Sequence, residues 1–257
     1  MEVDSREVID WSVVFFGEYE KHMRDLLERS LRVGDVAIDV GANVGVHTLT
    51  MARLVGPAGR VLALEPNPSA LKRLRRNVEL NALEQVAVVP CAAGAYATRL
   101  QLRVPAEDSR EGANPGLASL VALETPHSVV EVDVQPLDAV LRVEPLGQVS
   151  LIKIDVQGYE CQVLRGATET LGMFAPLVVF EFEPWAWRQA ERRWEDARDL
   201  LEGLSYELWR LDAAARGGLR LLPLTAMPRD HAEVVAMRGD GHQAGALRGR
   251  IAGPMDG

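Results

Sequence analysis

The sequence predicts a doubly wound α/β fold, in which a mostly parallel sheet carries helices on both faces. The first observation is the apolar run Val36–Val40, which ends in a glycine-bearing turn and leads into a helical pattern from His47 to Val55. A strand buried on both faces has this pattern. The second is that three later apolar runs, at 61–65, 150–155 and 177–183, also end in a carboxylate. The third is a group of late strands without helices between them, which must close the sheet antiparallel.

The chain before the first strand, residues 1–35, is predicted to be a helical lead-in of the same domain. A helix is expected over Glu18–Leu31, because apolar residues recur along one stripe, and Gly34 ends it. The apolar cluster around Trp11 and Phe15 is interpreted as packing at the edge of the sheet in preference to substrate contact.

After the second strand, a helix is expected over Ser69–Leu80, with Ser69 as its N-cap. A third strand follows at Gln85–Pro90. Two β-forming runs, Arg99–Val104 and Val129–Gln135, are expected to pair with each other outside the main sheet. The insertion between them, about 105–128, is polar and rich in small residues, and is predicted to be lid-like.

The second half of the chain alternates helices with strands and then ends in strands. The helices are expected at Leu137–Val143, about 159–171 and Glu183–Gly203, and the late strands at Tyr206–Leu211, Leu219–Leu224 and Glu233–Met237. The Gly- and Ala-rich tail over 239–257 has little core-forming content and is expected to be disordered. One domain over 36–238 is therefore predicted.

Composition and charge argue against several classes of function. A net charge of −9 without a Lys/Arg cluster argues against nucleic-acid binding. No apolar run is long enough to span a membrane, and the N-terminus lacks a basic segment followed by an apolar one. Cys91 and Cys161 lie in or beside apolar runs, which favours free buried thiols in a reducing compartment. A soluble cytoplasmic protein without membrane association is expected.

The turn after the first strand favours a cationic ligand over a dinucleotide. It reads D-x-G-x-N-x-G from Asp39 to Gly45, and Asn43 stands where the fingerprint G-x-G-x-x-G has its middle glycine. A carboxylate there would repel a pyrophosphate but suits the sulfonium and ammonium of S-adenosylmethionine. Glu65, which ends the second strand, is placed to accept hydrogen bonds from two ribose hydroxyls. A dehydrogenase, or a fold whose acids merely cap helices, are the weaker alternatives.

Four carboxylates are predicted to converge on one crevice. In open α/β sheets, ligands bind beyond the carboxyl ends of the strands. The acids at those ends are Asp39, Glu65, Asp155, and Glu181 or Glu183.

These motifs together resemble the FkbM family of S-adenosylmethionine-dependent methyltransferases. The resemblance covers about 36–183 and rests on V-A-I-D-V-G-A-N-V-G-V-H-T-L, L-A-L-E-P-N-P, R-N-V-E-L-N, Q-P-L-D and L-I-K-I-D-V-Q-G-Y-E-C-Q-V-L-R-G-A, in that order. It implies the class I methyltransferase fold, a Rossmann-like doubly wound sheet of seven mostly parallel strands with the last strand antiparallel. It also implies methyl transfer to a small-molecule acceptor, usually to a hydroxyl of a natural product, sugar or lipid-like compound.

The resemblance also implies which residues bind the cofactor. The methionine end would be held by Asp39, Gly41, Asn43 and Gly45, the ribose by Glu65 with Asn67 beside it, and the adenine would be flanked by the stretch around Ala92. The chain departs from the family at one place, because the family usually reads K-x-D-x-E-G and this chain has Gln157 where the Glu stands. Gln157 cannot ionise, so no acid–base or metal role is expected for it.

Methyl transfer to a hydroxyl benefits from a base that removes the proton. The candidates are Asp155, Glu160, Glu181 and His47. Asp155 has the best predicted position, whereas His47, on the first turn after the glycine loop, is more readily interpreted as packed or adjacent to the cofactor. No compact ligand motif for a metal is present, so none is predicted.

Three hypotheses stay open at this stage. The first is O-methylation of a hydroxyl on a small natural product or sugar. The second is N-methylation of an amino sugar or another cation, which the acidity of the chain favours. The third is a non-catalytic relic that binds cofactor or a partner, for which Gln157 is the hint. The tryptophans Trp185, Trp187 and Trp194 either wall the acceptor pocket or pack in the core, and a homodimer is left open.

Overall fold

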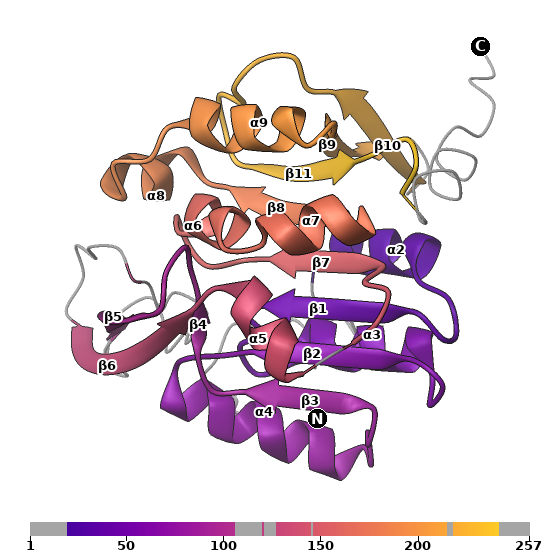
Figure 1. Ribbon diagram of the computed structural model, residues 1–257, viewed down its shortest axis with the longest axis vertical. Coiled ribbons are helices and arrows are strands. Elements are labelled where there is room, and N and C mark those ends of the chain that lie inside the picture. Colours follow the sequence, from indigo (N-terminus) through magenta and orange to yellow (C-terminus); the bar gives the residue numbers. More distant parts are fainter. Residues whose placement is uncertain (1–19, 106–119, 121–126, 145, 215–217, 242–257) are drawn as a thin grey trace.

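The computed structural model describes residues 20–105, 120, 127–144, 146–214 and 218–241. Within these ranges, eight strands form a main sheet and three form a small one (Figure 1). The main sheet runs in the order β10 (Gly218–Pro223), β9 (Glu207–Ala214), β11 (Ala232–Met237), β8 (Leu177–Phe182), β7 (Leu151–Ile154), β1 (Val36–Val40), β2 (Arg60–Leu64) and β3 (Val86–Val89).

The centre of the main sheet is parallel and buried. β1 pairs in parallel with β2 and β7, and the pairing continues in parallel to β3 on one side and β8 on the other. All five residues of β1 and all four of β7 are buried, which explains why these strands read as nearly continuous apolar runs. The exceptions are Asp39 and Lys153, which are register partners across the β1–β7 pair.

The late strands close the sheet through antiparallel pairs. β11 pairs antiparallel with both β8 and β9, and β10 pairs antiparallel with β9. The predicted antiparallel closure is therefore confirmed. The main sheet has eight strands in the described chain and not seven, because the hairpin partner β10 extends it beyond β9.

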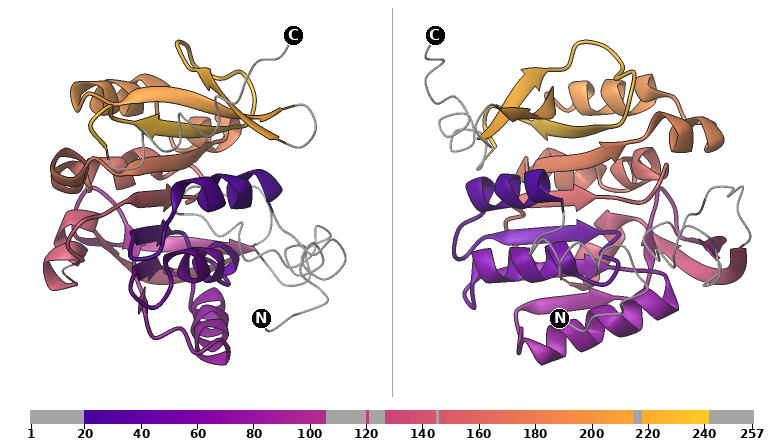
Figure 2. Two further views of the ribbon diagram at one scale, coloured as in Figure 1. Left: turned by 90° about the vertical axis from the view of Figure 1, so that its right-hand side faces the viewer. Right: turned by 180° about the vertical axis from the view of Figure 1, so that it is seen from behind.

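Helices cover both faces of the main sheet, as Figures 1 and 2 show. One face packs against α2 (Lys21–Ser30), α3 (Val46–Val55) and α4 (Pro68–Leu80). The other packs against α5 (Leu137–Val143), α6 (Glu160–Arg165), α7 (Thr168–Phe174), α8 (Pro184–Gln189) and α9 (Trp194–Gly203). The strands alternate between these two cores, so that Ala37 contributes to the first and Ile38 to the second.

The structure corrects three predicted helices. The helix expected over about 159–171 is divided at Gly166, where a side chain would overlap the backbone carbonyl of Gly94. The helix expected over Glu183–Gly203 is divided between α8 and α9, and Glu191 between them has a left-handed φ of 53°. The N-cap of α4 is Asn67 and not Ser69, because the Asn67 side chain accepts the Ser69 N–H.

The predicted excursion from the main sheet is present as β4 (Ala92–Ala93), β6 (His127–Gln135) and β5 (Thr98–Pro105). β5 and β6 pair with each other, as expected, and the pairing is antiparallel. The expectations for the aromatic lead-in before residue 20, for nearly all of the insertion at 105–128 and for most of the tail lie outside the described residues.

Both cysteines are free and buried, as predicted. Among the helices that the structure describes, none combines the length and the apolar character that crossing a membrane requires.

Candidate functional site

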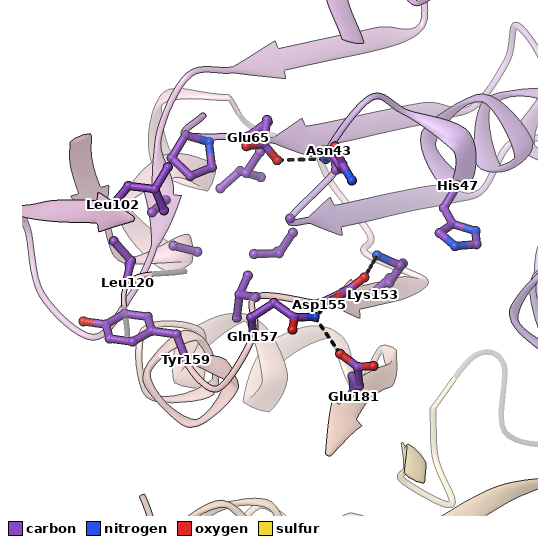
Figure 3. A pocket seen from close by; sticks show the side chains of 18 of the residues that line it. Asn43, His47, Glu65, Leu102, Leu120, Lys153, Asp155, Gln157, Tyr159 and Glu181 are labelled. Carbon is purple, nitrogen blue, oxygen red and sulfur yellow. Dashed lines mark hydrogen bonds and ion pairs between the residues drawn. The ribbon is translucent and has the colours of Figure 1, made fainter. Parts of the chain in front are cut away.

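A cavity of about 430 Å³ lies at the carboxyl ends of β1, β2, β7 and β8. This is the edge at which the sequence predicts a crevice. Figure 3 shows that its two ends differ in chemistry: Leu102, Leu120 and Tyr159 lie at one end, and Asp155, Gln157 and Glu181 lie toward the other. We call these the apolar end and the reaction end.

The glycine turn is tightly enclosed by protein. Gly41 has a φ of 78°, and a Cβ at this position would overlap the backbone carbonyl oxygen of Asp155. Gly45 has a φ of 96°, and its Cβ would lie 2.6 Å from Cδ1 of Leu74. Gly41 and Asn43 line the cavity, whereas Gly45 does not. Gly41 thus lets the ends of β1 and β7 approach each other, and Gly45 lets α4 pack against the turn.

Glu65 lines the cavity, and its carboxylate connects two loops. Its Oε2 accepts the Asn43 N–H at 2.8 Å and its Oε1 accepts the Asn67 N–H at 2.7 Å. Burial raises the pKa of Glu65 to about 7, against the lowering effect of these two N–H donors. Each oxygen retains a further lone pair, so the carboxylate can also accept hydroxyl donors from a ligand.

Asn67 was expected beside the cofactor, but it does not line the cavity. Its backbone N–H fixes Glu65, and its Oδ1 accepts from the backbone N–H and the hydroxyl of Ser69. Asn67 therefore acts on the cavity through Glu65 while it caps α4.

Apolar residues from several separate parts of the chain line the cavity. Ala92, which the sequence predicts beside the adenine, lines the cavity together with Leu64, Pro66, Cys91 and Ala93. Leu102 from β5, Leu120 and Tyr159 complete it, and none of these three was predicted. Leu102 is the buried member of an alternating strand pattern, but the sequence does not show which cavity that strand covers.

Asp39 does not reach the crevice on which it was expected to converge. Its side chain is completely buried, and its Oδ2 accepts the Thr48 hydroxyl at 2.6 Å. Its Oδ1 lies 3.4 Å from the ammonium nitrogen of Lys153. Any effect of Asp39 on a ligand therefore passes through Lys153 and the glycine turn.

Lys153 is a residue of the site that the sequence reasoning did not single out. Its Nζ lies 3.4 Å from both Asp39 Oδ1 and Asp155 Oδ2, and the residue is 2% exposed at the wall of the cavity. Burial alone would lower the pKa of Lys153, but the carboxylates of Asp39, Asp155 and Glu20 raise it above its ordinary value. The ammonium thus stays charged.

The reaction end brings two predicted acids together. The amide nitrogen of Gln157 donates to Asp155 Oδ1 at 3.2 Å and to Glu181 Oε2 at 2.9 Å (Figure 3). Burial, followed by the charges of Asp155, Glu160 and Glu20, raises the pKa of Glu181 to about 9. Asp155 and Glu181 both line the cavity, and their side chains are 31% and 26% exposed.

Glu160, a predicted candidate base, does not line the cavity. It is 1% exposed, and its Oε1 accepts the backbone N–H groups of Val156 and Gly158 at 3.3 and 3.1 Å. Burial raises its pKa to about 7, although these donors lower it. Its position suits it to hold the loop before α6 and not to contact an acceptor.

His47 lies at the cavity wall with Glu20, and the His47 Nε2 is 2.8 Å from the Glu20 carboxylate. Of the three tryptophans, only Trp185 lines the cavity, where it is 41% exposed beside Glu183. Trp187 and Trp194 are buried and contact Phe180 and Phe182 in the core. Trp185 is therefore a residue of the cavity wall, whereas Trp187 and Trp194 are core residues.

The cavity fits the cofactor that the sequence predicts. It has the size of a small-molecule site. It offers the buried Glu65 carboxylate on its wall, an apolar end and an end lined by acids, which suit ribose, adenine and sulfonium. Among the described residues, no group of three or more His, Cys, Asp or Glu side chains could hold a metal ion.

The topology and this site together define a class I methyltransferase fold. The family model described as "Methyltransferase FkbM domain" matches residues 39–208. The chain therefore belongs to the FkbM methyltransferase family.

Two curated relatives are similar over part of their length. "Methyltransferase 1" of Beauveria bassiana is 34% identical over 145 residues, which are 50% of this chain and 57% of the relative. Methyltransferase sdnD of Sordaria araneosa is 34% identical over 156 residues, 51% of this chain and 60% of the relative. The chain thus spans less than two thirds of either relative. A solved FkbM methyltransferase from Methylobacillus flagellatus has 19% identity and a TM-score of 0.46, over 79% of this chain and 43% of its own.

Proposed function

We propose that the protein is an S-adenosylmethionine-dependent methyltransferase that methylates a hydroxyl group of a small molecule. The observation that carries this proposal is the cavity itself. It places the Glu65 carboxylate between an apolar end and a reaction end at the carboxyl edge of a class I sheet.

The cofactor would supply a methyl group on a positively charged sulfur, and the residues of the chain would meet the other needs of the reaction. Glu65 would hold the ribose, with its orientation fixed by two backbone N–H groups. Ala92, Leu102 and Tyr159 would enclose the adenine. The predicted contact of Asn43 with the methionine end stays part of this proposal.

Asp155 would accept the proton of the acceptor hydroxyl. Its carboxylate lines the cavity, and donors on both sides fix it: Lys153 at one oxygen and Gln157 at the other. The O–C bond would form as the C–S bond breaks, and the proton would move to Asp155 Oδ. A positioned base of this kind contributes about 10²–10⁴-fold to a rate.

N-methylation is the second candidate, and a specific observation favours it. Glu20, Glu65, Asp155, Glu181 and Glu183 all line the cavity, whereas the ammonium of Lys153 there is already paired with two carboxylates. This negative field suits a protonated amine. An amine that loses its proton to water would not need Asp155 as a base.

The test is incubation with isotopically labelled S-adenosylmethionine and a panel of small alcohols, sugars and amino sugars, followed by mass analysis of the product. We expect a labelled O-methyl product and a rate at least about 100-fold lower for Asp155→Asn. A labelled N-methyl product whose rate Asp155→Asn leaves unchanged would replace the first candidate by the second. A folded protein that binds no S-adenosylhomocysteine would contradict both.

A further inference from the structure

The loop Val156–Gly158 presents Gln157 to the cavity from a constrained backbone. Gln157 has a φ of 53°, a left-handed conformation that costs a residue with a side chain about 1 kcal/mol or more. A Cβ on the next residue, Gly158, would lie 2.8 Å from the carbonyl oxygen of Ala186. Glu160 accepts the N–H groups on both sides of Gln157. These contacts hold the backbone of the loop in place and direct the side chain of Gln157 toward Asp155 and Glu181.

The orientation of the Gln157 amide follows from its neighbours. Its nitrogen lies 3.2 Å from Asp155 Oδ1 and 2.9 Å from Glu181 Oε2, and a carboxyl oxygen that carries no proton accepts hydrogen bonds. The amide nitrogen has two N–H bonds, so it can donate one to each acid. The amide thus holds the side chains of Asp155 and Glu181 together at the cavity wall.

A bridge between two carboxylates is also what a divalent cation provides. Mg²⁺, Mn²⁺ and Ca²⁺ prefer carboxylate oxygens. Glu has the same shape as Gln, so a Glu side chain at 157 would bring a third carboxylate to the two that already lie within 3.2 Å. Three carboxylates that close together require a proton or a cation between them.

We propose that Gln157 is a specificity-determining residue of the reaction end: its amide bridges Asp155 and Glu181 and keeps out the divalent cation that a carboxylate at this position would recruit. This inference rests on the proposed function for the role of the reaction end. Gln157 then has a role in the site, and its presence in place of the Glu of K-x-D-x-E-G has a physical reason.

The test is a calorimetric titration of the full chain with Mn²⁺, for the wild type, Gln157→Glu and the double variant Gln157→Glu/Glu181→Gln. We expect saturable binding to Gln157→Glu alone, with a Kd on the order of 0.1–1 mM, in the weak range of protein oxygen sites. Lys153, at the other oxygen of Asp155, keeps the affinity modest. Gln101→Glu, on an exposed position of β5, controls for the added charge and should not bind.

Two outcomes would overturn the inference: Mn²⁺ binding to the wild type as tight as to Gln157→Glu, or no saturable binding to a folded Gln157→Glu. Circular dichroism of every variant establishes folding, which the equal shape of Gln and Glu favours. A parallel titration with S-adenosylhomocysteine separates the two proposals. If the wild type fails to bind it, the proposed function is wrong, while the Mn²⁺ result still decides the role of Gln157.

Discussion

The buried pair of Lys153 and Asp39 allows a quantitative prediction for the variant Lys153→Met. Asp39 is fully buried and Lys153 is 2% exposed, with 3.4 Å between Nζ and Oδ1. At an effective dielectric constant near 20, two charges at this separation attract by about 5 kcal/mol. Methionine fills a similar volume, so the variant mainly removes the positive charge. It leaves Asp39 with the Thr48 hydroxyl but without a cation.

We expect Lys153→Met to lower the free energy of unfolding by about 3–5 kcal/mol, the range measured when one partner of a buried pair is removed. This is a large part of the roughly 5–15 kcal/mol that stabilises a typical domain. The assay is urea unfolding at pH 7, followed by circular dichroism. The matched control is Asp39→Asn/Lys153→Met, in which both charges are absent and most of the stability should return.

A loss of less than about 1 kcal/mol in the free energy of unfolding of Lys153→Met would show that this buried ion pair does not stabilise the fold as its depth requires. The same conclusion would follow if the double variant were no more stable than the single one. In that case the shape of the lysine side chain, and not its charge, would be what the fold requires.

Gly41, Glu65 and Glu160 each give a measurable effect on stability or binding. Gly41→Ala should cost more than about 2 kcal/mol in urea unfolding, because its Cβ overlaps the Asp155 carbonyl; Gly34→Ala, with φ 92° but open space, should cost about 1 kcal/mol. Affinity for S-adenosylhomocysteine, measured by calorimetry, should fall about tenfold from pH 8 to pH 6 as Glu65 takes up a proton near its pKa of about 7, and Glu65→Gln should remove this dependence. Between pH 4.5 and pH 8, the free energy of unfolding of the wild type, measured in urea, should fall by about 2–3 kcal/mol relative to that of Glu160→Gln.

The raised pKa of Glu160 makes the folded protein less stable at high pH than at low pH. Burial raises the pKa of Glu160 to about 7, above its value in the unfolded chain. The folded state therefore holds the proton more tightly, and stability present below pH 4.5 is lost as the pH rises through about 7. A wild type that gained stability over Glu160→Gln in this window would contradict the burial argument. An affinity for S-adenosylhomocysteine that does not change between pH 6 and pH 8 would contradict the role of the Glu65 carboxylate in binding.

The parts of the site that the sequence predicts are those that follow from strand order. Glu65, Asp155 and Glu181 lie near the carboxyl ends of strands, and parallel strands bring those ends to one edge. Side-chain direction was not predictable in the same way. Asp39 lies one residue before the end of β1 and is turned beneath the cavity toward Lys153.

Long-range contacts explain what was missed. Leu102 and Leu120 reach the cavity from an excursion whose docking depends on tertiary packing, and no local pattern encodes this. The same holds for the break after α6, which depends on Gly166 meeting the distant carbonyl of Gly94. Lys153 belongs to the motif L-I-K-I-D, which does not show what its side chain contacts. Its ion pairs with Asp39 and Asp155 depend on the pairing of β1 with β7, which places Lys153 beside Asp39.

We propose that this cavity binds S-adenosylmethionine through Glu65. The most direct test is calorimetric titration of the full chain with S-adenosylhomocysteine, beside Glu65→Ala and Asp39→Ala. We predict one saturable site for the wild type, with an affinity that Glu65→Ala weakens by at least about tenfold, because two charge-assisted hydrogen bonds to the ribose are lost. Asp39→Ala should weaken binding through the glycine turn. No heat of binding and no thermal shift from folded wild-type protein would show that the cavity does not bind this cofactor.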